Sequence, residues 1–246
     1  AARPPGRAGA HGEHRDPGSR GVHLTRVGDI NIPAPVSTGS DGRPFFGLSS
    51  FRPRPNRGLD AVRLTSTDAN SVYSSLQIGL TRRWESGFQF QFNYTYGRSI
   101  DDASAYRREF TNSMVESPYY FNRTGDRGLS NFHIAHTAVL QYTWNLPFSY
   151  PRRSVVGFLL NDWQMSGILT FSGGYPFTAN VSFDIARTRV REGDRPDLVP
   201  GASNNPVLGG PDRYFDISAF KLQPTGYLGT LGRNTLVGPG LATLDI

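Results

Sequence analysis

One stretch of alternating apolar and polar residues, residues 72–98, constrains the fold of this chain more than any other feature. Alternation with a period of two is typical of a β-strand that has one apolar and one polar face. Residues 85–87 (Glu-Ser-Gly) interrupt the pattern, and glycine suits the left-handed backbone of a tight turn. The pattern predicts a hairpin with arms at residues 71–84 and 87–98. In the second arm, Phe88, Phe90, Phe92, Tyr94 and Tyr96 alternate with Gln89, Gln91, Asn93 and Thr95.

The length of these arms points to a membrane. The first arm has 14 residues, or roughly 46 Å at about 3.3 Å per residue, whereas a tilted strand of about 9–11 residues already crosses a bilayer. Aromatic residues near the ends of the arms, such as Trp84 and Tyr96, fit the interfacial girdles of outer-membrane barrels. A long hairpin in a soluble β-sandwich is the alternative at this point.

Composition narrows the class further. The 246 residues are enough for one β domain, and 37% of them are hydrophobic, as in a barrel whose lumen and loops are polar. The absence of cysteine excludes disulfides, thiolate metal sites and cysteine nucleophiles. The net charge of +6 comes with arginines scattered through turns and loops, so we expect no nucleic-acid partner.

Alternation elsewhere predicts an all-β, antiparallel protein. Besides the two arms, we expect strands at residues 21–29, 59–65, 133–146 and 162–172, and the start of another at 241. The connections are in turn short (85–87), long (99–132), modest (148–161) and very long (173–240). Outer-membrane barrels have short periplasmic turns and long extracellular loops. This order therefore predicts a curved open sheet from a transmembrane β-barrel of the bacterial outer membrane, with both long loops outside.

The alternation also predicts which side chains face lipid and which face the lumen. We expect the apolar faces of the strands to contact lipid and the polar faces to line the lumen. The predicted lipid-facing residues are Phe88, Phe90, Phe92, Tyr94, Leu140, Tyr142 and Leu169. The predicted lumen-facing residues are Gln89, Gln91, Asn93, Gln141 and Thr143.

The two ends of the sequence lead to a prediction about its extent. Residues 1–16 are rich in Pro, Gly, His and Arg, which predicts a disordered or wrongly assigned segment without an export signal. Residues 17–246 predict a partial barrel truncated before its final strands, so we expect a fragment that aggregates in water. His11, His14 and His23 are close in sequence, but no carboxylate-rich surroundings favour a metal site.

Several segments, in their order along the chain, resemble one family. They are GSRGVHL (18–24), YSSLQ (73–77), YTYGRSIDD (94–102), RGLSNFHIAH (127–136), WQMSGI (163–168), SGGYPF (172–177) and LGRNTLVGPG (231–240). Together they resemble the C-terminal barrel of TonB-dependent outer-membrane receptors, and most closely the Oar-like group with a carboxypeptidase-regulatory-like domain. The resemblance implies a 22-stranded barrel that takes up a substrate with energy from the TonB complex, which would act through an N-terminal plug missing from this chain.

No catalytic arrangement is visible in the sequence. His133 and His136 would lie on opposite faces of a strand, and the adjacent Asp101 and Asp102 fit the solvated start of a loop better than a glycosidase pair. No nucleophile elbow or phosphate loop is present. We therefore expect no enzyme activity, no cofactor and no metal site.

Three functions stay open from the sequence. The first is part of a TonB-dependent receptor and transporter for an unidentified substrate, in contact with outer-membrane lipid. The second is a structural or adhesive outer-membrane β-protein that transports nothing. The third is a soluble β-sandwich binding module.

Overall fold

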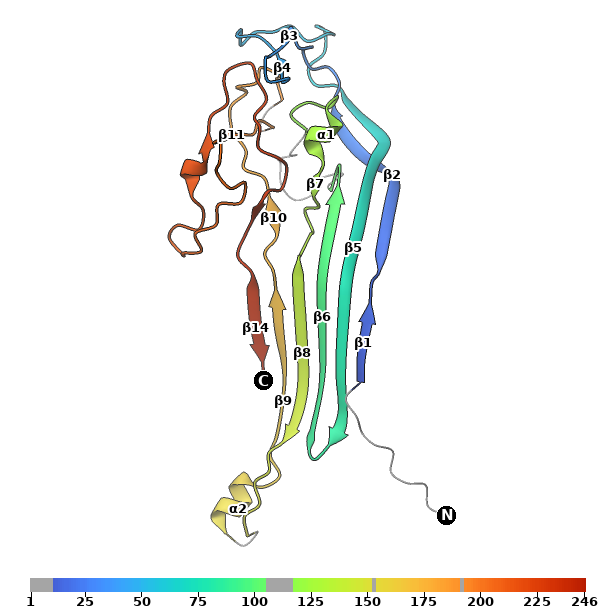
Figure 1. Ribbon diagram of the computed structural model, residues 1–246, viewed down its shortest axis with the longest axis vertical. Helices are drawn as coiled ribbons and strands as arrows, with labels where there is room; N and C mark the ends of the chain where they lie inside the picture. Colours follow the sequence, from blue (N-terminus) through green and yellow to red (C-terminus); the bar gives the residue numbers. More distant parts are fainter. Residues whose placement is uncertain (1–10, 105–116, 152–153, 191–192) are drawn as a thin grey trace.

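In the computed structural model, residues 11–104, 117–151, 154–190 and 193–246 are described, and they form one long antiparallel sheet with a layer of loops at one end (Figure 1). The main strands are β1 (His11–Arg15), β2 (Gly18–Asp29), β5 (Arg63–Glu85), β6 (Phe88–Asp101), β8 (His136–Asn145), β9 (Gln164–Ser172) and β14 (Leu241–Asp245). Their order in the sheet is β1-β5-β6-β8-β9-β14, and β2 also pairs with β5. The predicted all-β antiparallel class is confirmed.

The hairpin of β5 and β6 forms the middle of the sheet. Its turn has positive φ at both central residues, 53° at Ser86 and 79° at Gly87, as a two-residue type I′ turn requires. The pairing runs from Glu85 opposite Phe88 to Ser71 opposite Asp101. The predicted turn and both predicted arms are therefore present.

One predicted boundary is wrong. The strands expected at residues 59–65 and 71–84 are a single 23-residue strand, β5, which begins at Arg63. The polar residues around Asp68 suggested a break, but Arg26 of β2 donates two hydrogen bonds to the Asp68 carboxylate, at 2.9 and 3.0 Å. The partner strand thus stabilises a segment whose composition alone favours a turn.

The prediction of disorder for residues 1–16 is wrong for residues 11–15. These residues form β1, with His11 opposite Thr81 and Arg15 opposite Gln77. Main-chain hydrogen bonds to the edge of a long strand need no apolar side chains, so the composition gave no sign of this pairing. Residues 1–10 lie outside the described part of the chain.

The short elements all lie in the connections. They are β3 (Ser37–Thr38), β4 (Pro44–Phe45), α1 (Arg123–Asp126), β7 (Gly128–Leu129), α2 (Val155–Leu160), β10 (Pro176–Phe177), β11 (Asp197–Leu198), η1 (Ile217–Ala219), β12 (Phe220–Lys221) and β13 (Leu236–Val237). Residues 173–240, predicted to be irregular, therefore contain paired segments: β10 pairs with β13, and β11 with β12. In the described part, no helix is long and apolar enough to span a membrane.

The long connections gather at one end of the sheet, as predicted. In Figure 1 the described parts of residues 99–132 and 173–240 lie at the upper end, while the β5–β6 turn and α2 lie at the lower end. A buried hydrophobic cluster of Phe46, Ala186 and Leu228, with Tyr119 packed against it, also belongs to the connections. By contrast, large apolar side chains on the sheet are exposed, including Tyr96 and Phe171 at 49% each.

Candidate functional site: the sheet faces and the loop layer

The register of the sheet sorts the predicted site residues into two faces. Directly opposed residues of neighbouring strands point to the same side of a sheet. Phe90 is opposite Tyr142, and Phe92 is opposite Leu140, which is in turn opposite Leu169. All seven residues predicted to face lipid, Phe88, Phe90, Phe92, Tyr94, Leu140, Tyr142 and Leu169, therefore share one face, which we call the aromatic face.

The opposite face carries the residues predicted to line the lumen. Gln89 is opposite Thr143 and Gln91 is opposite Gln141, while Asn93 is opposite Val139. Ile168 also belongs to this polar face, since it is opposite Gln141. The alternation in the sequence therefore divides these residues into the same two groups as the strand register does. Which of the two faces contacts lipid stays a prediction.

At the upper end of the sheet, three connections form what we call the loop layer: residues 30–62, the described part of 117–135, and the described part of 173–240. Arg233 joins two of them to β6. Its guanidinium donates to the carboxylate and, at 2.7 Å, to the carbonyl oxygen of Asp101, to the carbonyl oxygen of Asp126 at 2.6 Å, and to Ser104 Oγ at 3.1 Å. A Cβ on Gly128 would lie 2.4 Å from the Arg233 carbonyl oxygen, so this contact requires glycine.

Other arginines with little exposed surface repeat this arrangement between segments distant in sequence. Each makes an ion pair with an aspartate and also donates to a backbone carbonyl oxygen. They are Arg195 with Asp126 at 2.7 Å, Arg43 with Asp197 at 2.9 Å, and Arg54 with Asp29 at 2.5 Å. Because removal of one partner from a buried pair is strongly destabilising, these contacts hold the loop layer in one arrangement.

The predicted solvent exposure of the two adjacent aspartates is wrong. Asp101 and Asp102 were expected to be solvated, but their side chains are only 3% and 7% exposed. Asp101 accepts from Arg233, and Asp102 accepts from Arg123 at 2.8 Å and Arg127 at 3.1 Å. Burial alone would raise the pKa of Asp102, but the two arginines outweigh it and hold that pKa below its usual value.

The two histidines considered as a metal pair are separate. The strand starts at His136 and not at 133, so His133 lies before β8, buried, with its Nδ1 accepting from the Ser99 backbone N–H at 3.3 Å. His136 is exposed on the aromatic face, where Tyr94 Oη lies 2.8 Å from its Nδ1. In the described part of the chain, no group of three or more His, Asp or Glu residues could hold a metal ion.

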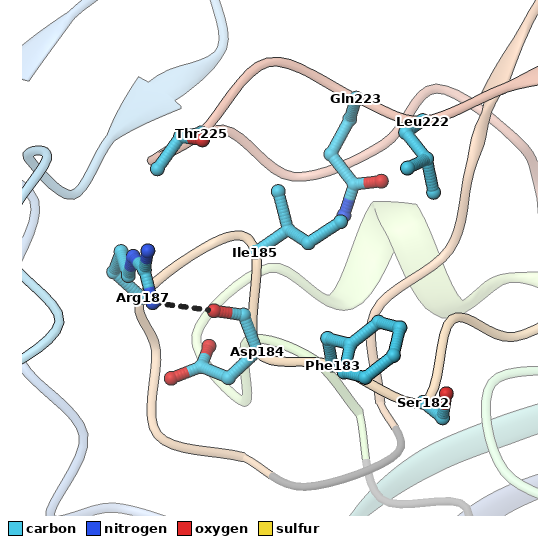
Figure 2. A pocket seen from close by; sticks show the side chains of 8 residues that line it. All are labelled: Ser182, Phe183, Asp184, Ile185, Arg187, Leu222, Gln223 and Thr225. Carbon is cyan, nitrogen blue, oxygen red and sulfur yellow. Dashed lines mark hydrogen bonds between the residues drawn. The ribbon is translucent and has the colours of Figure 1, made fainter.

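A pocket of about 710 Å³ opens in the loop layer between residues 182–187 and 222–225. Figure 2 shows its lining, with Phe183 and Leu222 on one side and the Arg187 guanidinium hydrogen-bonded to the Asp184 carbonyl oxygen on the other. Phe183 and Leu222 are 70% and 65% exposed. Exposed apolar side chains beside a few polar groups are typical of a ligand site.

Behind this pocket lies a buried carboxylate. Asp194 is 1% exposed, and its Oδ2 accepts from the Ala186 N–H at 2.7 Å and from Gln223 Nε2 at 3.2 Å. Asp194 Oδ1 and Gln223 Oε1 have no hydrogen-bond partner among the described residues. Burial raises the pKa of Asp194 to about 6, and the nearby Asp184 adds to this effect.

Sequence reasoning missed the residues that organise this layer, above all Arg233, Arg195 and Asp194. The one available signal was that charged residues stand next to Gly or Pro in segments without alternation, as in Arg195-Pro196-Asp197. Their partners lie up to 132 residues away, so spacing could not reveal the pairs.

Comparison with known proteins adds the family. A family model described as "Outer membrane beta barrel domain" matches residues 17–246. No curated protein and no solved structure matches the chain.

Proposed function

Because the chain belongs to the outer membrane beta barrel domain family and is located in the bacterial outer membrane, we propose that it forms part of a TonB-dependent receptor barrel. In this proposal the barrel takes up a substrate with energy from the TonB complex, and it catalyses no reaction. The aromatic face contacts lipid, and the polar face lines the lumen. The soluble β-sandwich no longer stands as an alternative, since the family is one of the outer membrane.

The observation that carries the proposal is the loop layer. Its arginines form buried ion pairs with aspartates on the strand ends and on neighbouring loops, so it presents a fixed outer surface with a pocket of about 710 Å³. Binding residues held on a rigid scaffold are typical of receptors. The order of the family-like segments from residue 18 to residue 240 supports the same assignment.

The substrate enters the proposal only as a class. The pocket combines the exposed apolar side chains of Phe183 and Leu222 with the polar groups of Asp184 and Arg187. Such a lining suits a molecule with both an apolar surface and hydrogen-bonding groups.

Energy coupling provides the test. The source bacterium, a strain lacking this gene and a strain lacking TonB function are grown in the same medium, and the disappearance of solutes is followed by mass spectrometry. We expect at least one solute to be retained in the medium by both mutants. A structural or adhesive protein would alter surface attachment in the gene deletion without retaining any solute that the TonB mutant retains, and this outcome would refute transport.

A further inference from the structure

The aromatic face changes character at its upper end. Below, β6 carries Phe88, Phe90, Phe92, Tyr94 and Tyr96; the next residue on the same face is Arg98. Arg98 is opposite Ser74, which is also opposite Gly18 of β2. Two residues further up, Arg20 is opposite Val72 on this face. His136, opposite Tyr96, completes what we call the basic rim: Arg20, Arg98 and His136.

The basic rim is exposed and largely unpaired. All three residues are exposed, and within the described part of the chain neither the Arg20 nor the Arg98 side chain makes an ion pair or hydrogen bond. Two aspartates lie at this end of the face: Asp102 is already paired with Arg123 and Arg127, and Asp16 lies 3.6 Å from His14. The rim therefore offers net positive charge to an external partner.

The height of the rim matches a membrane surface. From Phe88 to Arg98 the strand covers ten residues, or about 33 Å at about 3.3 Å per residue. At a tilt of about 40° this corresponds to roughly 25 Å along the membrane normal, which is the height of the apolar band of an outer-membrane barrel. Arg98 then lies at the level of the lipid headgroups, at the end where the long loops mark the outside.

The spacing of the rim suits one anionic headgroup. Arg20 and Arg98 are two strands and one row of side chains apart, so their Cα atoms are about 12 Å apart for strands about 4.8 Å apart. Two flexible arginines at this distance can reach two phosphate groups of one molecule. Guanidinium groups bind phosphate through paired hydrogen bonds.

An apolar groove continues downward from the rim. It has a volume of about 430 Å³ and is lined by Tyr94, His136, Ala138, Phe171, Leu241 and Ala242, among others. The small side chains Ala138 and Ala242 flank Phe171 in one row across three strands, which leaves room for a hydrocarbon chain. With Tyr94 Oη donating to His136 Nδ1, the neutral imidazole carries its proton on Nε2. That N–H can donate to a ligand at the top of the groove.

From the charge, height and groove together, we propose that the basic rim and this groove bind one phosphorylated lipid of the outer leaflet. Its phosphates accept hydrogen bonds from Arg20 and Arg98, its headgroup accepts one from His136, and one acyl chain occupies the groove. The proposal rests on the aromatic face contacting lipid, but it does not require TonB-dependent transport.

The test measures lipid binding to the protein purified in detergent from outer membranes and freed of lipid. The probes are lipid A with both phosphates, the same lipid after enzymatic removal of its phosphates, and inorganic phosphate, each titrated by native mass spectrometry. The variants are Arg20→Ala combined with Arg98→Ala, Arg98→Lys, and the control Arg83→Ala. Arg83 is also exposed, but it lies near the β5–β6 turn at the other end of the sheet.

We expect the double variant to bind phosphorylated lipid A about 30-fold more weakly, the equivalent of about 2 kcal/mol for two interfacial cations. Arg83→Ala should change its affinity less than about threefold. Arg98→Lys keeps the charge but loses the paired hydrogen bonds, so it should weaken binding more than Arg83→Ala does and less than the double variant does. The dephosphorylated lipid should bind the unmodified protein and the double variant equally weakly. Equal binding of the two lipids by the unmodified protein, or undiminished binding by the double variant, would overturn the proposal. Displacement of the lipid by millimolar inorganic phosphate would also overturn it, in favour of a free-anion site. Since none of these measurements uses TonB, transport can fail its own test independently.

Discussion

Replacement of Arg233 by alanine should loosen the loop layer while leaving the sheet intact. The Arg233 side chain is 11% exposed and binds Asp101, whose side chain is 3% exposed. Without the guanidinium, the Asp101 carboxylate keeps the hydroxyl of Ser104, at 2.7 and 2.8 Å, as its side-chain donor. An uncompensated buried charge costs about 3–5 kcal/mol, so local opening of the layer should become about 10²–10⁴ times more frequent.

A matched control lies in the same connection. Arg213 pairs with Asp216 at 3.1 Å, but the two side chains are 66% and 36% exposed, so Arg213→Ala should cost less than about 1 kcal/mol. The assay is hydrogen exchange of the backbone amides of Asn234 and Val237, which bond to Thr178 Oγ1 at 2.8 Å and to Asn205 Oδ1 at 3.0 Å. If Arg233→Ala and Arg213→Ala changed the free energy of opening equally, buried ion pairs would not be what holds the layer together.

Three other predictions follow from the faces, the buried carboxylate and the loops. Phe92→Arg should cost about 2–4 kcal/mol in the refolded barrel and Gln91→Arg much less; equal tolerance in denaturant titrations would mean that the facing is wrong. The pKa of Asp194 is about 6 in the folded layer and 3.8 otherwise, so the folded layer binds the extra proton between these values and loses roughly 2–3 kcal/mol as pH rises from about 4 to 6. Asp194→Asn should remove this dependence from the exchange of the Ala186 amide, and an unchanged pH profile would contradict the assignment. Protease added to intact cells should cut within residues 99–132 or 173–240, whereas cuts confined to residues 85–87 or 148–161 would invert the topology.

The sheet was predictable because its determinants are local. The alternation along β6 and β8 is enough to place Phe92 and Leu140 on one face, where the register also places them, and a single glycine, Gly87, marks the turn. Even so, local composition failed where pairing with a neighbouring strand decided the outcome. β1 forms along the edge of β5, and Arg26 sustains β5 through Asp68.

The loop layer was not predictable because the residues that stabilise it lie far apart in the sequence. Its stability comes from ion pairs such as Arg43 with Asp197, which are 154 residues apart, and such pairs leave no periodic trace. Asp101 illustrates the difference. Its position at the end of a strand favours a solvated carboxylate, but in the fold it accepts hydrogen bonds from Arg233, which is 132 residues away. The sequence thus predicted the location of the long loops at one end, but not how they are held.

The most direct test of the central claim is a cysteine scan of β6. The chain contains no cysteine, so single substitutions from residue 88 to residue 98 can each carry one spin label in the bilayer-inserted protein. We predict that even positions up to 96 are accessible to dissolved oxygen, which concentrates in lipid, and that odd positions are accessible to a water-soluble nickel complex. Accessibility without this alternation, or access of the nickel complex to both sets, would contradict a barrel wall with its aromatic face in lipid.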